Sequence, residues 1–195
     1  MQADPGPIRI LHGIAPQHRI AAAALYWRYF GAQILPLPTT PRQGITLIRA
    51  ALRPDHALIA LAPSGRMVGI AGIRDAGGGI LRPDPSSFHA VWGPVRGQLR
   101  HRAAGLFRAG PPTSDLILDG IAVRPGWRGR GIARLLVGTA IAHASQTGHR
   151  ALRAEVAAGN HAALAAWRAM GFAPMARVRL GWPWSAPAHV LRLTL

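Results

Sequence analysis

One short segment limits what this chain can fold into: the run Arg-Gly-Arg-Gly-Ile-Ala at 128–133. The apolar stretch 119–123 before it predicts a strand, residues 124–127 hold the proline and glycine of a turn, and a long helical pattern follows. A strand that turns through glycines into a helix leaves unpaired backbone N–H groups at the positive end of the helix dipole. Such a turn predicts a site for a phosphate-bearing ligand.

Two other phosphate-binding loops are excluded. The chain contains no lysine, which the P-loop needs beside its glycines. Arg134 occupies the place of the last glycine in the dinucleotide pattern G-x-G-x-x-G. What remains is a turn of the form R-x-x-G-x-A, for which a flexible turn without a ligand is the alternative.

The strong positive charge is the second feature that bears on function. The formal net charge is +16, because 23 arginines face only seven acidic residues. The arginines are scattered and accompany abundant alanine, glycine and proline, which indicates a compositional bias. We therefore do not expect nucleic acid as a partner, although steep salt dependence of RNA or DNA binding would support that alternative.

Length and composition predict a single domain over residues 1–195. The absence of cysteine excludes disulfides, thiolate metal sites and cysteine nucleophiles. No apolar run approaches the roughly 18 residues that a membrane span needs, so we expect no membrane association. Residues 1–5 lack the basic start of a secretory signal, and a cytoplasmic location is expected.

Hydrophobic periodicity and turn residues predict an alternation of strands and helices. The predicted strands are 8–11, 56–62, 67–73, 119–123, 151–156, 172–180 and 188–195, and the predicted helices are 20–30, 43–52, 132–147 and 160–170. Gly31 is the expected end of the first helix. One or two further helices are expected in an insertion at 86–107, which packs in the core, covers the substrate side or forms a contact in a homodimer. The sequence leaves a monomer and a homodimer open.

A second motif follows the first by about 30 residues. Asn160 opens a short predicted helix that ends in Trp167, three further residues and Gly171-Phe172. Together, in this order and spacing, the two motifs resemble those of the GNAT acyltransferase superfamily, and the resemblance covers residues 115–180. It implies an α+β fold with three layers: a mixed, mostly antiparallel sheet of about seven strands, splayed between the fourth and fifth, with helices on both faces.

The resemblance also implies a cosubstrate, acetyl-coenzyme A (acetyl-CoA), and no metal. Backbone groups of Ile121 and Val123 would bind the pantetheine arm as an added strand would. The pyrophosphate would be held by the cofactor-binding residues Arg128, Gly129, Arg130, Gly131, Ile132 and Ala133. Asn160 would approach the pantetheine near the thioester, and a plain helix N-cap is its alternative role.

Acyl transfer to an amine requires a base and a donor for the carbonyl oxygen. The resemblance makes the backbone N–H of Val123 the oxyanion donor. Only Asp115, Asp119 and Glu155 among the acids lie on the two splayed strands. Asp119 is the candidate base, because strand alternation places its side chain on one face with Ile121 and Val123. An aspartate paired with an arginine is the alternative.

The acceptor side is less clearly marked. Tyr26, Trp27 and Tyr29 lie on the helix that often borders the acceptor pocket in this family, and packing in the core is their alternative role. Trp167 stands where many members carry a tyrosine, and an indole N–H does not release its proton at useful pH. The sequence therefore predicts an N-acetyltransferase acting on a primary amine of a small molecule or protein, with a catalytically weak CoA-binding sensor or interaction module as the alternative.

Overall fold

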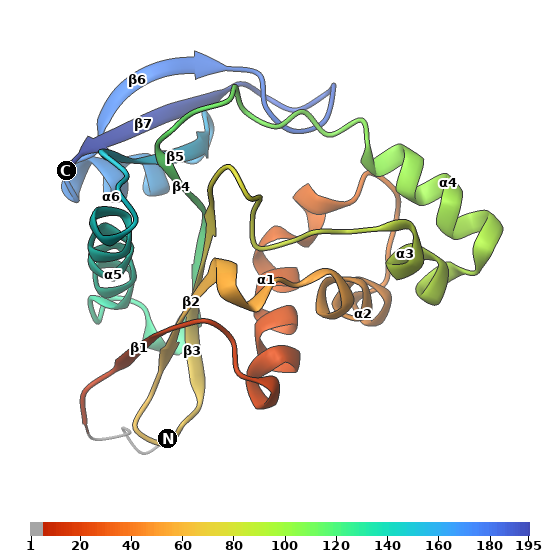
Figure 1. The fold of residues 1–195 in the computed structure, drawn as a ribbon, viewed down its shortest axis with the longest axis horizontal. Helices are drawn as coiled ribbons and strands as arrows, with labels where there is room; N and C mark the ends of the chain where they lie inside the picture. The colour runs from red at the N-terminus through yellow and green to blue at the C-terminus, as the bar shows by residue number, and fades with distance from the viewer. Residues whose placement is uncertain (1–5) are drawn as a thin grey trace.

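The computed structural model describes residues 6–195, so residues 1–5, on which the expectation about a secretory signal rests, lie outside it. Its strands and α-helices follow one another as Figure 1 shows. They are β1 (Arg9–His12), α1 (Arg19–Ile34), α2 (Pro41–Ala51), β2 (Ala57–Leu61), β3 (Met67–Arg74), α3 (Pro85–Trp92), α4 (Pro94–Ala104), β4 (Leu116–Val123), α5 (Ile132–Gln146), β5 (Ala151–Ala157), α6 (His161–Ala169), β6 (Ala173–Val178) and β7 (Ala188–Thr194).

The strands form one mixed sheet with the order β1-β2-β3-β4-β5-β7-β6. Every neighbouring pair is antiparallel except β4 and β5, which are parallel. Helices α5 and α6 cover one face, and α1 and α2 cover the other (Figure 1). These layers confirm the predicted three-layer α+β fold of about seven strands.

Each face of the sheet carries its own buried core. Leu116, Leu136 and Leu152 are fully buried on the α5 face. Ile59 is fully buried on the α1 face, where Ile48 is 1% exposed. Because helices cover both faces of the sheet, the side chains on both faces of its central strands are buried. These strands therefore consist almost entirely of apolar residues.

The sheet opens between β4 and β5. These strands pair only at Leu116 with Leu152, Ile117 with Arg153 and Leu118 with Ala154. Beyond this point β4 continues to Val123 and β5 to Ala157 without pairing to each other. The expected splay between the fourth and fifth strands is therefore confirmed.

Helix α1 is longer than the sequence predicts. It passes Gly31 in helical conformation and ends at Ile34, so the prediction of Gly31 as its end is wrong. Leu35 is extended, with φ −125° and ψ 131°. The physical reason is Pro36, because a residue before proline is disfavoured in the helical region. Gly31 instead provides room for the Trp27 ring, which a Cβ at this position would approach to 2.7 Å.

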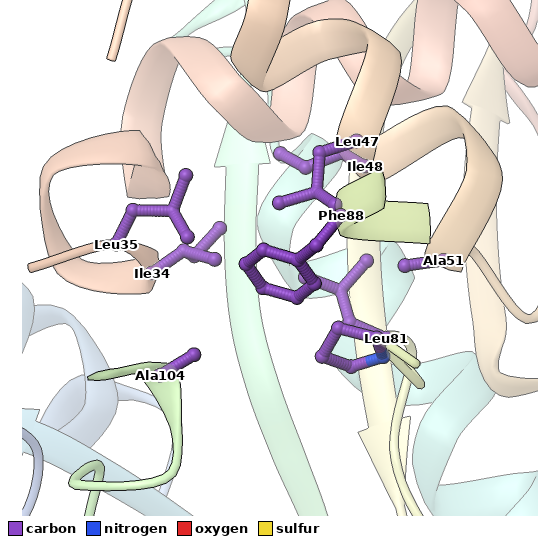
Figure 2. A pocket seen from close by; sticks show the side chains of 9 residues that line it. Ile34, Leu35, Leu47, Ile48, Ala51, Leu81, Phe88 and Ala104 are labelled. Atoms are coloured by element: carbon purple, nitrogen blue, oxygen red, sulfur yellow. The ribbon is translucent and has the colours of Figure 1, made fainter. Parts of the chain in front are cut away.

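The predicted insertion consists of α3 and α4. Helix α3 begins at Pro85 because the side chain of Asp84 accepts a hydrogen bond from the Ser87 N–H, forming an N-cap. Phe88 is fully buried against Leu35 and Leu47, beside a small apolar cavity of about 30 Å³ (Figure 2). The first helix of the insertion is thus part of the core.

We expect Phe88→Leu to lower the free energy of unfolding by about 1 to 2 kcal/mol, because the smaller side chain enlarges this cavity and loses ring contacts. Urea denaturation measures the change. Val95→Ala on α4 is the control, since Val95 is 82% exposed and its truncation should stay within about 0.5 kcal/mol. Equal effects of the two substitutions would mean that α3 does not contribute to the core.

The His143 ring lies 4.6 Å from the His12 ring, measured between centroids. Burial, and then the positive charges of His12 and His149, lower the pKa of His143 from its ordinary value of 6.5. The unfolded chain therefore takes up a proton near pH 6.5 that the folded chain resists. The free energy of unfolding should fall as the pH decreases through 6.5 toward the lower folded pKa. His143→Gln should flatten this slope in melting temperatures measured from pH 8 to pH 5, and an unchanged slope would contradict the assignment.

Candidate active site

A cleft of about 690 Å³ lies at the opening between β4 and β5. Five parts of the chain line it. They are α1 (Tyr29, Phe30, Gln33), the end of β4 (Leu118 and 120–123), the turn and first residues of α5 (127–134 except Arg130), the end of β5 (155–157) and α6 with Asn160. The cleft therefore joins the predicted phosphate turn to the gap in the sheet.

The turn before α5 presents an open helix N-terminus. Gly129 and Gly131 have φ values of +74° and +75°, a region that favours glycine. Within residues 6–195, no side chain caps the helix at Gly131, and its first turn contains no acidic residue. The first N–H groups of the helix have no helical partner, so they and the dipole together form a site for an anion.

The arginines beside this turn differ in position. Arg128 Nε donates a hydrogen bond of 3.2 Å to the Val123 carbonyl, and its guanidinium lies 5.2 Å from the centre of the Tyr29 ring. Arg130 stacks on Trp127 and does not line the cleft. Arg134, for which the sequence predicts no role, does line it. Of these three arginines, Arg128 and Arg134 are therefore the ones that line the cleft.

The exposed edge of β4 directs backbone groups into the gap. The Arg124 N–H donates to the Val68 carbonyl of β3 at 2.9 Å. Because hydrogen-bonded and non-hydrogen-bonded pairs alternate in an antiparallel ladder, Ala122 also bonds to β3, while Ile121 and Val123 direct their N–H and C=O groups away from it. Ile121 therefore offers its N–H and C=O to a ligand lying between β4 and β5, and Val123 offers its N–H, since its carbonyl already accepts a hydrogen bond from Arg128.

The predicted common face of Asp119, Ile121 and Val123 is wrong. Between β3 and β4 the register shifts, because Ala71 pairs with Ile121 and Ile73 with Leu118. Gly120 forms the extra residue of this bulge with a φ of +93°. Ile121 and Val123 pack on the α5 side of the sheet, and the bulge leaves the Asp119 side chain on the α1 side.

The surroundings of Asp119 raise the pKa of its carboxyl. Its Oδ1 is 3.8 Å from Arg74 Nε, and its carbonyl accepts a hydrogen bond of 3.1 Å from the Tyr26 hydroxyl. Burial raises the pKa of the Asp119 carboxyl, the charge of Glu155 raises it further, and Arg74 opposes both. The side chain keeps 35% of its exposure, so a ligand on the α1 side can reach it. A carboxyl with a raised pKa is suited to accept a proton near neutral pH.

Glu155 is a second carboxylate at the opening, for which the sequence predicts no role. Glu155 Oε2 accepts a hydrogen bond of 2.8 Å from Arg74 Nη2, and its Oε1 lies 3.4 Å from Arg153 Nη2. Unlike Asp119, Glu155 lines the cleft. The signal in the sequence is the only glutamate of the chain, on a strand that reaches the splay and whose other residues, apart from Arg153, are apolar.

The three aromatic residues expected at the acceptor pocket separate in the structure. Tyr29 lines the cleft, and Tyr26 and Trp27 do not. Tyr26 is buried beneath Asp119, and Trp27 packs against Gly44 of α2. The core-packing alternative therefore describes Tyr26 and Trp27. Phe30 and Gln33 line the cleft instead, one and four residues after Tyr29 on the same helix.

Comparison with known protein families identifies the family of this chain. The sequence model of the acetyltransferase (GNAT) family matches residues 20–172, which is most of the chain. The chain belongs to the GNAT acetyltransferase family. This membership indicates acetyl transfer, and no curated protein matches the sequence significantly.

Solved structures resemble this GNAT chain in fold at low sequence identity. An N-acetyltransferase from Staphylococcus aureus is 17% identical with a TM-score of 0.66, and the match covers 95% of this chain and 100% of that one. A GCN5-related N-acetyltransferase from Kribbella flavida is 18% identical with a TM-score of 0.60, covering 96% and 98%. A proposed acetyltransferase from Salmonella typhimurium, solved with its cofactor acetyl-CoA, is 16% identical with a TM-score of 0.59, covering 96% and 94%.

The second GNAT motif lies on the α6 side of the cleft. The Asn160 side chain accepts a hydrogen bond of 3.1 Å from the Ala163 N–H and so caps α6, while the residue also lines the cleft. Trp167 lines the cleft too, is only 8% exposed and packs edge-on against Phe172. Asn160 therefore acts as the N-cap of α6, the alternative role considered from the sequence, and it also lies in the wall of the cleft.

In residues 6–195 we find neither a metal-binding cluster nor a helix that could span a membrane. Residues 6–195 contain no cluster of three or more histidine, cysteine or acidic side chains arranged to hold a metal ion. The helices in that part of the chain are also too short or too polar for any of them to span a lipid bilayer.

Proposed function

We propose that this GNAT chain is an acetyl-CoA-dependent N-acetyltransferase that transfers the acetyl group to a primary amine of a small molecule or protein by direct attack. The supporting observation is a single cleft that joins an uncapped helix N-terminus to a gap in the sheet. A diphosphate suits the first feature and an extended amide-bearing arm suits the second.

The residues present fit acetyl-CoA in detail. The N–H groups of 129–133 would hold the pyrophosphate, with Arg128 and Arg134 as charged partners. The backbone of Ile121 and Val123 would bond to the amides of the pantetheine arm as a neighbouring strand does. No side chain of the cleft has to be displaced from the helix N-terminus, since none caps it.

The chemistry uses groups at the gap. The acceptor ammonium gives one proton to the Asp119 carboxylate, and the free nitrogen then forms a bond to the thioester carbon. The Val123 N–H, the donor expected from the sequence, lies roughly 10 to 13 Å along β4 from Asp119, so the Ile121 N–H, which also faces the gap, would instead donate to the carbonyl oxygen as negative charge develops there. The C–S bond would then break, and the released thiolate would take up the second proton of the nitrogen, directly or through water. Asp119 finally releases its proton to water.

A catalytically weak CoA-binding module is the second candidate, and Trp167 favours it. Its indole N–H stands where many members of the family have a tyrosine, and it cannot protonate a leaving thiolate. Because a thiol has a pKa near 8.5, the thiolate leaves without full protonation at neutral pH, so we favour the enzyme.

Two measurements separate these candidates. Titration calorimetry with acetyl-CoA should show binding, and a panel of primary amines should give amine-dependent release of free thiol. Binding without thiol release from any amine would support the sensor or interaction module. Absence of binding would contradict both.

A further inference from the structure

Two segments far apart in the sequence are joined by backbone hydrogen bonds. Residues 105–110 follow α4, and residues 179–187 connect β6 to β7 (Figure 1). The backbones of Arg108 and Gly181 exchange two hydrogen bonds, of 2.8 and 2.9 Å. The two segments carry three aromatic side chains, which we call the aromatic rim: Phe107, Trp182 and Trp184.

The aromatic rim is held in place but largely exposed. The buried Trp182 ring meets Phe107 edge-on at 5.2 Å and stacks on Trp184 at 5.9 Å, measured between centroids. Two hydrogen bonds between Trp182 and Ser185, of 2.8 and 2.9 Å, close the turn that carries both tryptophans. Phe107 and Trp184 are nevertheless 47% and 67% exposed. Exposed apolar surface in a fixed position is suited to bind a ligand, because little motion is lost on binding.

Helix α1 runs along the cleft and shows which end of it the aromatic rim adjoins. The Tyr29 ring contacts Arg128 at the phosphate turn, and the Phe30 ring packs on the bulge of β4. One helical turn beyond Tyr29, the Gln33 carbonyl accepts a hydrogen bond of 2.9 Å from Trp182 Nε1. The aromatic rim therefore adjoins the cleft on the side away from the phosphate turn.

A second contact places the aromatic rim near the gap in the sheet. Gly110 lies directly against Glu155 Oε1, and Glu155 is the first residue of β5 after the strands part. Phe107 is three residues before Gly110, so the two Cα atoms are at most about 11 Å apart. An acceptor whose nitrogen meets a thioester in the gap can therefore reach the aromatic rim with a group on a short chain.

The charges near the aromatic rim favour an aromatic ring over a second ammonium group. Aromatic side chains also bind cations, but both segments lack acidic residues and carry the exposed arginines Arg108 and Arg179. At the gap, Glu155 is already bonded to Arg74 and lies beside Arg153. A second cation on the acceptor would thus meet positive charge, whereas a neutral ring can stack on the exposed tryptophan.

We infer that the aromatic rim binds the ring of an aryl-substituted acceptor, so that the preferred substrates are arylalkylamines whose amino group is their only cation. This inference rests on the proposed function. The ring stacks on Trp184 beside Phe107, and the alkyl chain spans the distance from the ring to the gap.

Kinetics with matched amines test the inference. The wild type should prefer phenethylamine or 4-phenylbutylamine, which bracket the chain length, to butylamine by at least about tenfold in kcat/KM. Trp184→Ala should raise KM for the preferred aryl amine about tenfold, because the ring loses both stacking and apolar contact. It should change kcat less than about threefold and leave KM for butylamine within about twofold. Trp184→Phe keeps a ring and should retain most of the aryl preference.

A control variant and a binding measurement keep the test decisive. Ile20 is 61% exposed, similar to Trp184, but lies roughly 20 Å along α1 from Gln33, so Ile20→Ala should leave every KM unchanged. Ligand-observed NMR should show that the preferred aryl amine binds to the CoA-saturated protein and that Trp184→Ala weakens this binding about tenfold. Trp184-dependent binding without thiol release would support the aromatic rim as a binding site and contradict the proposed enzyme.

Other outcomes would overturn the inference. Thiol release with similar kcat/KM for aryl amines and butylamine, or with an unchanged aryl KM in Trp184→Ala, would overturn the subsite and leave the enzyme standing. A preference for 1,4-diaminobutane over both aryl amines would mean that a second cation, rather than a ring, is selected. Neither thiol release nor Trp184-dependent amine binding would overturn both proposals.

Discussion

Gly131→Glu is expected to abolish acetyl-CoA binding, with at least about a 100-fold loss of affinity in titration calorimetry. The new carboxylate would lie at the N-cap of α5, among the N–H groups proposed to hold the pyrophosphate. Two unit charges 4 Å apart repel each other by about 4 kcal/mol at an effective dielectric constant of 20. Each 1.4 kcal/mol corresponds to roughly a tenfold change in affinity, so the repulsion alone accounts for the loss.

The same helix offers a matched control. Gly148 follows the other end of α5 and, like Gly131, has a positive φ; a Cβ at either glycine would have no heavy atom within 4 Å. Gly148→Glu therefore introduces the same charge and backbone strain far from the cleft, and should leave acetyl-CoA affinity unchanged. Gly131→Ala retains the strain without the charge and should lose less than about tenfold. Similar losses in all three variants would show that strain, rather than the phosphate site, is responsible.

Asp119→Asn is expected to lower kcat by about 100- to 10,000-fold, the usual contribution of a general base, with little change in acetyl-CoA affinity. Burial raises the pKa of this carboxyl, and the base acts only when ionised. The wild-type rate should therefore fall as the pH decreases through that raised pKa, at higher pH than an ordinary aspartate would give. The pH profile of Asp119→Asn should lack this acidic limb.

Stability separates a catalytic role of Asp119 from a structural one. Because its folded pKa is raised, ionised Asp119 destabilises the folded state at neutral pH relative to the unfolded chain. The neutral amide should thus unfold at a temperature no lower than the wild type. Parallel losses of kcat, cofactor affinity and melting temperature would instead mean that the carboxylate serves mainly to position Arg74.

The elements of the fold were largely predictable because their signals are local. Asn160 before α6 and the glycines of 129–131 before α5 each mark a helix start within a few residues. Gly31 shows the limit of such rules. Its φ is helical, and the helix ends where Pro36 follows Leu35.

The site was less predictable because it depends on contacts between distant segments. Strand alternation placed Asp119 on the wrong face, since the bulge at Gly120 depends on the register with β3. The cation that joins the two carboxylates, Arg74, is 81 residues from Glu155 in the chain. Periodicity within one strand contains no information about either contact.

A crystal structure of the complex with acetyl-CoA tests the account most directly. We expect pyrophosphate oxygens within hydrogen-bond distance of the N–H groups of 129–133, and the pantetheine arm paired with Ile121 and Val123 between β4 and β5. The thioester should lie at the opening flanked by Asp119 and Glu155. A diphosphate bound elsewhere, or strands β4 and β5 closed beside an empty turn, would contradict the account.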